Sequence, residues 1–241
     1  MCSSGVSAIM EYENLRERVC AANLEISRTG LAILTWGNAS EADRGAGVFA
    51  IKPSGVDYSV LTPEKVVVVS IDSGELVAGN LRPSSDTATH AELYRSFPGI
   101  GGVVHTHSAY ATSWAQSYRS IPCFGTTHAD NFYGEVPCTP ALSPEDVEGD
   151  YERNTGRVIV NHFNKCNLDA DAVSAVLVGG HGSFTWGRDA AKAVEAAMVL
   201  ENVAMMALHT MMLNPAAGPI DQFLQDRHFY RKHGENAYYG N

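Results

Sequence analysis

Two histidines separated by one residue are the first feature of this sequence that could do chemistry. His105 and His107 stand in "IGGVVHTHSAYATSWAQ", residues 100–116, where a short apolar run predicts a strand. Alternate side chains of a strand share a face, so the two rings should point the same way, about 6 to 7 Å apart. One metal ion between the rings and a hydrogen-bonded pair at a strand end both explain this spacing.

A third histidine favours the metal. His181 in "VLVGGHGSF" lies between glycines just after an apolar strand, where a bare backbone lets the ring approach a site closely. Three imidazoles with an open position suit a catalytic zinc ion, and such a set also accepts manganese or cobalt. Asp86 in "RPSSDTATH" is the candidate oxygen ligand, although an Asp before a helix also suits the N-cap position.

Three further segments are rich in hydrogen-bond donors. "PSSD" precedes a predicted helix, whose N-terminal N–H groups attract anions. "IKPSGVDY" and "TWGNAS" read as turns that follow or precede strands, and ordinary turns explain the same residue types. The candidates for a substrate or phosphate seat are Gly37, Asn38, Lys52, Ser54, Gly55, Ser84 and Ser85.

The elements that must position these residues form an α/β pattern, with helices on a mixed sheet. Helices are predicted over 11–32, 87–97, 108–118 and 188–213, and strands over 47–52, 65–72, 74–79 and 101–107. Residues 171–187 predict a strand, a turn and a second strand. The Met and Ala stripe of 188–213 is expected to pack in the core. With no repeat or linker, residues 1–241 are expected to form one domain, of which 1–10 are a loose extension.

Composition excludes several classes of partner. The 241 residues carry a formal net charge of -10 without a Lys/Arg cluster, so nucleic acid and membrane surfaces are not expected partners. The apolar runs are too short to span a membrane, and the N-terminal residues do not resemble a signal peptide. The sequence therefore predicts that the protein is cytoplasmic. Five cysteines at scattered spacings predict reduced thiols.

Seven segments in this order resemble the class II aldolase/epimerase family, over nearly the whole chain after residue 10. They are "TWGNAS", "IKPSGVDYSVLTPEKVVVVSIDSGE", "RPSSDTATH", "GGVVHTHSAYATSWAQ", "GTTHADNFYG", "GGHGSFTWG" and "DRHFYRKHGENAYYG". The resemblance implies a three-layer α/β/α fold around a central, mostly antiparallel mixed sheet. It also implies a catalytic zinc ion and a C4 homotetramer with active sites shared between subunits.

The resemblance also implies roles for individual residues. Asp130 in "THADNFYG" matches one acid/base residue, and Tyr239 in "AYYG" matches another that reaches a neighbouring subunit's site, with His228 beside it. The implied metal ligands are His105, His107, His181 and Asp86, and the implied substrate and phosphate loops hold Gly37, Asn38, Ser54, Gly55, Ser84 and Ser85. Fuculose-phosphate aldolases of this superfamily carry Glu where this chain has Asp86, which favours an epimerase.

The implied reaction interconverts L-ribulose 5-phosphate and D-xylulose 5-phosphate in pentose catabolism, of arabinose or of ascorbate. Because C4 lies one carbon beyond the acidic α-position, inversion requires cleavage of C3–C4 by a retro-aldol step, rotation of glycolaldehyde phosphate and re-addition. The aldehyde must stay bound while it turns, which requires a firm phosphate seat, and opposed faces require two acid/base groups. An aldolase that releases the aldehyde, and a scaffold of the adducin type without metal, are the alternatives.

The C-terminal segment 226–241 is rich in aromatic residues. It is also basic and interrupted by glycine, so it is not expected to make a core helix of its own. The aromatic content nevertheless requires a surface to cover, and the resemblance places that surface on the next subunit.

Overall fold

The computed structural model describes residues 12–234 and 237–239, and the 1–10 extension therefore lies outside the described residues. Its centre is a seven-stranded sheet in the order β4-β3-β2-β1-β5-β7-β6. The strands are β1 (Gly37–Asp43), β2 (Val48–Ile51), β3 (Val67–Ser70), β4 (Leu76–Ala78), β5 (Gly102–Thr106), β6 (Ala175–Leu177) and β7 (Ser183–Gly187). All neighbouring strands in it are antiparallel, and an isolated bridge from Cys138 to Leu177 is parallel. The mostly antiparallel sheet predicted from sequence is confirmed.

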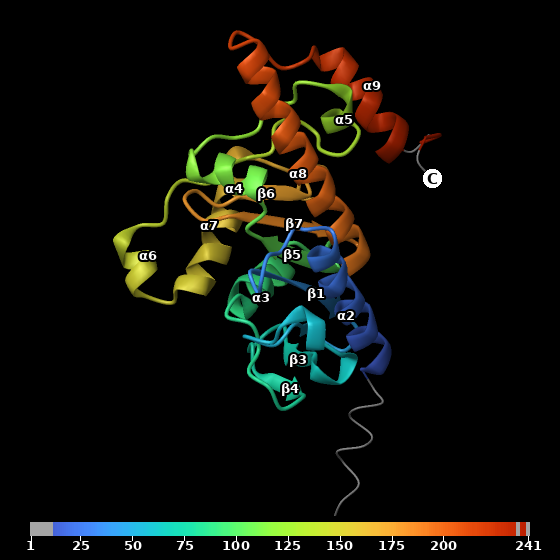
Figure 1. Cartoon of the computed structure of the whole chain (residues 1–241), viewed down its shortest axis with the longest axis vertical. Coiled ribbons are helices and arrows are strands. Elements are labelled where there is room, and N and C mark those ends of the chain that lie inside the picture. Colours follow the sequence, from blue (N-terminus) through green and yellow to red (C-terminus); the bar gives the residue numbers. More distant parts are fainter. Residues whose placement is uncertain (1–11, 235–236, 240–241) are drawn as a thin grey trace, which may run out of the picture.

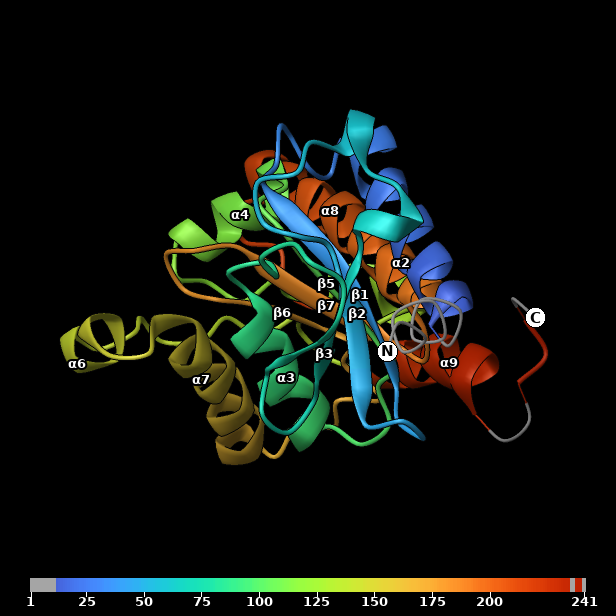
Figure 2. The same ribbon diagram turned by 90° about the horizontal axis from the view of Figure 1, so that it is seen from below.

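Helices cover both faces of this sheet, as Figures 1 and 2 show, with α2 and α8 on one face and α3 and α7 on the other. The helices are α2 (Glu13–Arg28), α3 (Thr87–Ser96), α4 (Ala109–Gln116), α5 (Thr126–Ala129), α6 (Pro144–Glu148), α7 (Tyr151–Cys166), α8 (Ala190–Leu213) and α9 (Gln222–His233). Two short 3-10 turns, η1 (Tyr58–Val60) and η2 (Pro63–Lys65), connect β2 to β3. The α/β/α architecture expected from the resemblance is therefore present.

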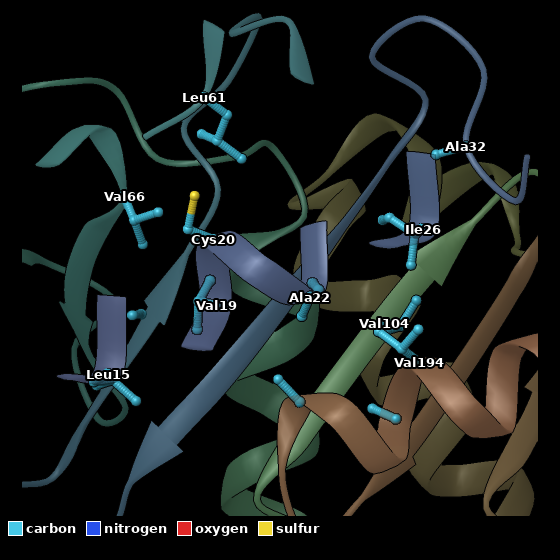
Figure 3. Packing of buried hydrophobic residues seen from close by; sticks show 14 of the residues in the cluster. Leu15, Val19, Cys20, Ala22, Ile26, Ala32, Leu61, Val66, Val104 and Val194 are labelled. Carbon is cyan, nitrogen blue, oxygen red and sulfur yellow. The ribbon is translucent and has the colours of Figure 1, made fainter. Parts of the chain in front are cut away.

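Helix α2 shows how apolar spacing builds one layer. Leu15, Val19 and Ile26 recur every three to seven residues on one side of the helix and are buried. Figure 3 shows this side packed toward Val104 of β5 and Val194 of α8. Truncating a fully buried side chain such as Ile26 to Ala costs about 2 to 5 kcal/mol, because it removes buried area and leaves a cavity.

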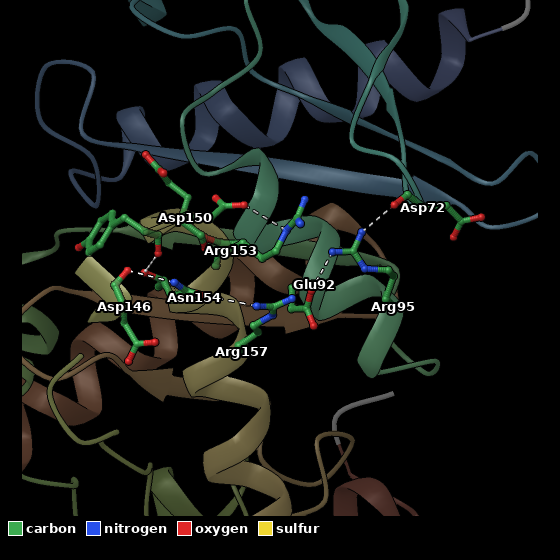
Figure 4. A network of polar contacts seen from close by, with 12 residues as sticks. Asp72, Glu92, Arg95, Asp146, Asp150, Arg153, Asn154 and Arg157 are labelled. Atoms are coloured by element: carbon green, nitrogen blue, oxygen red, sulfur yellow. Dashed lines mark hydrogen bonds and ion pairs between the residues drawn. The ribbon is translucent and has the colours of Figure 1, made fainter. Parts of the chain in front are cut away.

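The opposite layer has an apolar inner surface and a polar outer one. Phe97 and Phe163 lie against the buried ring of Trp186, with ring centroids 5.3 to 5.4 Å from it. On the outside, Arg95 donates to Glu92 at 2.8 Å and to the carbonyl oxygen of Asp72 at 3.1 Å, as Figure 4 shows. Ion pairs of this partly exposed kind contribute little to stability, so the apolar surface holds this layer in place.

One sequence expectation about local structure is wrong. "TWGNAS", residues 35–40, was expected to be a turn, but its last four residues begin β1, a strand in the middle of the sheet. Its residues are small and polar rather than β-branched, so strand pairing with β2 and β5, and not local preference, decides its conformation. The C-terminal segment was not expected to make a core helix, and its first part lies in α9, a mostly exposed helix whose Gln225 and Phe229 are buried in the packing around α5.

Helix α8 divides its small and large apolar residues between two faces. Ala193, Ala197 and Ala204 are buried against the sheet layer, whereas Met198 and Met206 are exposed. The expectation that methionines pack in the core is therefore wrong for these two residues. Among the described residues, α8 is the one helix long and apolar enough to cross a membrane, by length and composition only. The described cysteines are free thiols: Cys20, Cys123, Cys138 and Cys166.

Candidate metal centre

Central strands bring the three histidines together. His105 lies near the end of β5, directly opposite Asn38 of β1 on one side and Phe184 of β7 on the other. His107 follows one residue beyond the end of β5, and His181 lies in the turn between β6 and β7. Because β5 and β7 are antiparallel neighbours, the end of one strand meets the start of the other and the three rings converge.

The distances between the three rings fit one shared metal ion. The Nε2 atoms of His105 and His107 lie 3.1 Å apart, and one ligand nitrogen from each of the three rings falls within 4.8 Å of the others. The ring centroids of His105 and His107 are 4.8 Å apart, closer than the strand spacing predicts. The rings can approach because His107 lies past the last residue of the strand and is not held by its pleat. We call His105, His107 and His181 the histidine centre.

The hydrogen bonds and the burial of the three histidine rings leave ring nitrogens with lone pairs that can bind a metal ion. His105 places Nδ1 2.9 Å from the Ser183 carbonyl oxygen, to which a protonated Nδ1 donates, so Nε2 carries the lone pair. Burial lowers the pKa of His181 to about 4 and lowers the pKa of His107 as well. These two rings are therefore neutral at pH 7, which is the state that binds metal ions.

Glycine is needed at two positions around the histidine centre. A Cβ at Gly182 would lie 2.8 Å from the Thr106 carbonyl oxygen and 3.4 Å from the His105 ring. Gly37 has a φ of +129°, and a Cβ there would lie 2.8 Å from the His105 carbonyl oxygen. The bare backbone at both positions lets neighbouring strands close on the histidines.

Asp86 sits at the N-cap position of α3, but its side chain makes no capping hydrogen bond. Its Oδ2 instead accepts from Asn38 Nδ2 at 2.6 Å. Burial raises the pKa of the Asp86 carboxyl, but the nearby His105 and His90 rings and the Asn38 hydrogen bond outweigh burial and hold the pKa below its usual range. The side chain is thus an ionised, half-buried carboxylate beside the histidines rather than a helix cap.

The donor-rich loops expected to seat a phosphate lie side by side. Ser54 N–H donates to the Arg82 carbonyl at 2.9 Å, and Ser84 N–H donates to the Lys52 carbonyl at 3.2 Å. Asn38 also donates to Ser84 Oγ at 3.2 Å, so β1 is hydrogen-bonded to the loop that holds Ser84. Gly55 takes a φ of +69° in the turn, and Ser85 and Gly37 line the cavity beside the histidines.

Lys52 is a buried cation in this group. Its side chain is 2% exposed, and its Nζ lies 3.4 Å from the Pro53 carbonyl oxygen and 4.9 Å from the centroid of the Tyr58 ring. Burial lowers the pKa of Lys52, and within the described residues no carboxylate forms a salt bridge with it. An ammonium group held this way favours an anionic ligand over water.

A cavity of about 590 Å³ opens over the histidine centre and is large enough for a small phosphorylated sugar. Tyr151 places its hydroxyl 3.4 Å from His181 Nδ1 in this cavity. Six lining residues that the sequence did not predict are Thr35, Trp36, Thr112, Gln116, Tyr151 and Glu152. Tyr151 and Glu152 begin α7, and nothing in their local sequence distinguishes them from other helix starts.

The two predicted acid/base residues, Asp130 and Tyr239, and the neighbouring His228 lie elsewhere, around one arginine. Asp130, at the end of α5, accepts from Arg231 at 3.0 and 2.8 Å and from His228 Nδ1 at 3.1 Å. The Arg231 guanidinium lies 4.2 Å from the centroid of the Tyr239 ring. Burial raises the pKa of Asp130, but the Arg231 and His228 hydrogen bonds lower it further, so the net pKa is below its usual value. We call Asp130, His228, Arg231 and Tyr239 the Asp130 cluster.

Within one chain the Asp130 cluster does not reach the histidine centre. No residue of α5, α9 or the described part of the tail lines the cavity over the histidines. In Figures 1 and 2, α9 lies well away from α4, the helix that follows the "HTH" segment. The structure therefore divides the predicted site residues into two groups.

The fold and the histidine centre are those expected for a known family of proteins. Residues 17–208 match the family described as Class II Aldolase and Adducin N-terminal domain, and the chain belongs to this family. Its fold and relatives support activity of the epimerase or aldolase type.

The curated relatives are more specific. The chain is 50% identical over 228 residues to the "L-ribulose-5-phosphate 4-epimerase UlaF" of Salmonella paratyphi B, covering 95% of this chain and 99% of the relative. The protein of the same name from Salmonella choleraesuis has the same identity and coverage.

Solved structures share the fold at low identity. An L-fuculose 1-phosphate aldolase superposes with a TM-score of 0.74 at 21% identity, covering 95% of this chain and 96% of its own. The L-fuculose 1-phosphate aldolase from Glaciozyma antarctica PI12 gives 0.71 at 19% identity, with 98% and 88% covered. At this identity the likeness concerns the fold alone.

Proposed function

We propose that this chain is a metal-dependent 4-epimerase that interconverts L-ribulose 5-phosphate and D-xylulose 5-phosphate. The observation that carries the proposal is the 50% identity to curated epimerases over 95% of the chain, together with the converging histidines. We further propose that it acts in the cytoplasm, in the breakdown of arabinose or ascorbate.

The residues fit a divalent cation. His105, His107 and His181 offer one nitrogen each, and the half-buried Asp86 carboxylate supplies a negative charge beside them. Zinc suits three imidazoles and one carboxylate, and manganese or cobalt could replace it. When bound, the metal supplies Lewis-acid polarisation of the substrate carbonyl.

The loops of this chain hold the phosphate while the substrate rearranges. Ser54, Ser84 and Ser85 offer hydroxyl donors, and the buried Lys52 ammonium favours the negative charge. Cleavage of C3–C4 frees an aldehyde that must rotate and re-add without leaving. If the loops of Ser54 and Ser84, which hydrogen-bond to each other, bind the phosphate, the aldehyde stays bound during the rotation.

Protons at the C4 oxygen must be taken and returned on two opposite faces. We propose that Asp130 and Tyr239 do this, with His228 beside them, at the histidine centre of a neighbouring subunit. Two observations support a shared site: the three residues lie together, and they lie outside the cavity of their own chain.

The assembly we propose is a C4 homotetramer, in which each interface brings the Asp130 cluster of one subunit to the histidine centre of the next. Large apolar side chains exposed on α8 and α9 of the single chain support association. Met212, Leu213 and Phe223 are 71%, 88% and 73% exposed, more than an isolated surface in water favours.

Product analysis tests the function. Purified protein and L-ribulose 5-phosphate should yield D-xylulose 5-phosphate at equilibrium, followed by NMR, and chelation should abolish the conversion. Stoichiometric release of glycolaldehyde phosphate without xylulose 5-phosphate would instead establish an aldolase. Absence of bound metal with no effect of chelators would leave a scaffold of the adducin type.

A further inference from the structure

Helix α8 carries a single charged residue in its apolar C-terminal part. Between residues 196 and 213, Glu201 is the one Asp, Glu, Lys or Arg. Its side chain reaches α4, where Oε1 accepts from the Tyr110 N–H at 2.8 Å and Oε2 accepts from the Ala111 N–H at 2.9 Å. A carboxylate therefore lies at the N-terminus of the helix that directly follows the "HTH" segment.

These two N–H groups have no partner inside α4 itself. The first N–H groups of a helix lack an intrahelical acceptor, so the side chain of the N-cap residue usually accepts from the second or third of them. Ser108 is the N-cap residue of α4, but its side chain makes no capping hydrogen bond. Glu201, which is 90 residues from Ala111 in sequence, takes over this role. Its negative charge suits the positive end of the helix dipole.

A second hydrogen bond fastens the same two helices one turn further along. Trp114 Nε1 donates to the Ala204 carbonyl oxygen at 3.0 Å, and Trp114 is 5% exposed. Both residues lie about one helical turn beyond the Glu201 contact, each on its own helix. An isolated helix of eight residues is marginal in water, so α4 depends on α8 for its position.

Helix α4 in turn fixes one end of the segment that carries His107. The strand pairs of β5 end at Thr106, and α4 begins at Ala109. His107 therefore lies in a link of two residues between the sheet and the helix, and the direction of its ring depends on where the helix begins. Holding the N–H of Tyr110, three residues further on, limits the conformations open to this link.

The other end of α4 holds the turn that carries His181. The Ala115 carbonyl oxygen accepts from the Gly180 N–H at 2.9 Å, and Gly180 directly precedes His181. The approach is close, because a Cβ at Gly180 would lie 2.6 Å from the hydroxyl oxygen of Tyr118, just after α4. Two of the three histidines are thus joined to one short helix, whereas His105 is held by strand pairing.

We propose that Glu201 is a positioning residue, which ties α4 to α8 and thereby places the His107 and His181 rings for metal binding. The inference rests on the proposed function, because it takes the histidine centre to be the metal site. Glu201 itself is neither a member of the histidine centre nor a lining residue of the cavity above it, so its effect passes through α4.

Two substitutions at Glu201 grade the loss of this contact. Glu201→Ala removes both acceptors, and we expect it to weaken Co²⁺ affinity by about 10- to 100-fold. Glu201→Gln keeps the shape and one oxygen acceptor but turns its amide N–H group toward the other donor, so we expect a loss of about three- to tenfold. Affinity is measured on the metal-free full chain by competition with a chromophoric chelator. The visible absorption of bound Co²⁺ reports the ligand geometry, and the thermal midpoint reports stability.

Amide hydrogen exchange of the metal-free protein tests the path through α4 without the metal. Mass spectrometry should show faster exchange in Glu201→Ala over residues 108–116 and also over 178–182, because a loosened α4 releases the Gly180 N–H. Faster exchange over 108–116 alone would confine Glu201 to capping its own neighbour helix and would overturn the proposal.

Val194→Ala is the matched control on the same helix. Val194 is 4% exposed and belongs to the cluster of α2 residues rather than to the cluster that contains α4. Its truncation should lower the thermal midpoint, because it removes buried methyl groups. Co²⁺ affinity, the absorption of bound Co²⁺ and the exchange of 178–182 should stay unchanged.

Unchanged Co²⁺ affinity and absorption in Glu201→Ala would overturn the proposal. Equal weakening in Val194→Ala, at an equal loss of thermal midpoint, would overturn it in favour of general stability. If Glu201→Ala does not fold, Glu201→Gln decides: affinity and absorption equal to wild type reject the role. Failure of the wild-type protein to bind any divalent metal would remove the proposed function itself, whereas a metal-binding wild type with unaffected variants removes only the role of Glu201.

Discussion

The histidine centre and the Asp130 cluster are built in different ways. Strands β5 and β7 and the turn before β7 fix the three histidines at the middle of the sheet. The Asp130 cluster instead joins a four-residue helix, α5, to α9 and the chain end through Arg231. Strand pairing holds ligands rigidly around one point, whereas a peripheral cluster can be carried to a site on another subunit. The contrast is the basis of the proposal that one chain supplies two halves of different active sites.

The largest expected effect comes from removing the acid/base group. Asp130→Asn should lower epimerase turnover by about 10²- to 10⁴-fold while the protein keeps its metal, because the amide cannot take up a proton. Metal content by elemental analysis and turnover on L-ribulose 5-phosphate are the measurements. Asp226→Asn is the control, since Asp226 also lies on α9 and accepts a hydrogen bond from Tyr133, but it is not a member of the Asp130 cluster. Turnover near wild type in Asp130→Asn would remove this residue from the reaction.

At the histidine centre, a substitution should affect metal binding directly, whereas Asp130→Asn should leave the metal bound. His107→Asn should weaken metal binding and lower turnover by at least about tenfold, because it removes one of three imidazoles. His162→Asn on α7 is the matched control, since that ring lies outside the centre. Normal metal content in His107→Asn would break the distinction between the two regions.

Mixed oligomers test whether the two regions meet between subunits. Tyr239→Phe and His107→Asn should each be inactive alone. Co-refolded in equal amounts, they should recover about a quarter of wild-type activity, because in random tetramers one site in four combines an intact centre with an intact neighbouring tyrosine. Mixed tetramers verified by mass but without activity would show that Tyr239 serves its own subunit.

The smallest effect concerns stability around α5. Burial lowers the pKa of His128 to about 4, while its Nε2 donates to the Gly134 carbonyl at 2.9 Å. The unfolded chain takes up this proton near pH 6.5, so the contribution of neutral His128 is complete above that pH and falls away as the pH drops toward 4. The difference amounts to at most about 3 kcal/mol.

Urea unfolding of the metal-free protein between pH 7 and 4 measures this slope. His128→Gln should unfold with a shallower loss of stability over the same range, because its amide keeps a donor for Gly134 and does not titrate. An unchanged slope would show that other buried histidines, such as His90, dominate the acid response.

The sequence by itself determined the features that depend on local periodicity. The helices over Glu13–Arg28 and Ala190–Leu213 and the strand before the "HTH" segment follow from the spacing of apolar residues. The glycines around His181 likewise predicted a close approach of the backbone to the site. The structure confirms it at Gly182, where a Cβ would lie 3.4 Å from the His105 ring. Resemblance added Asp130, His228 and Tyr239, which no local pattern distinguishes from turn or tail residues.

Tertiary structure alone decided the rest. β1 is a strand because β2 and β5 pair with it, although its own small polar residues predict a turn. α9 forms because Phe229 finds a buried place near α5, and Tyr151 reaches His181 because α7 packs beside α3. Each of these outcomes depends on partners far away in the chain. Local sequence carries the preferences of a segment, but only packing and long-range hydrogen bonding determine which distant groups meet.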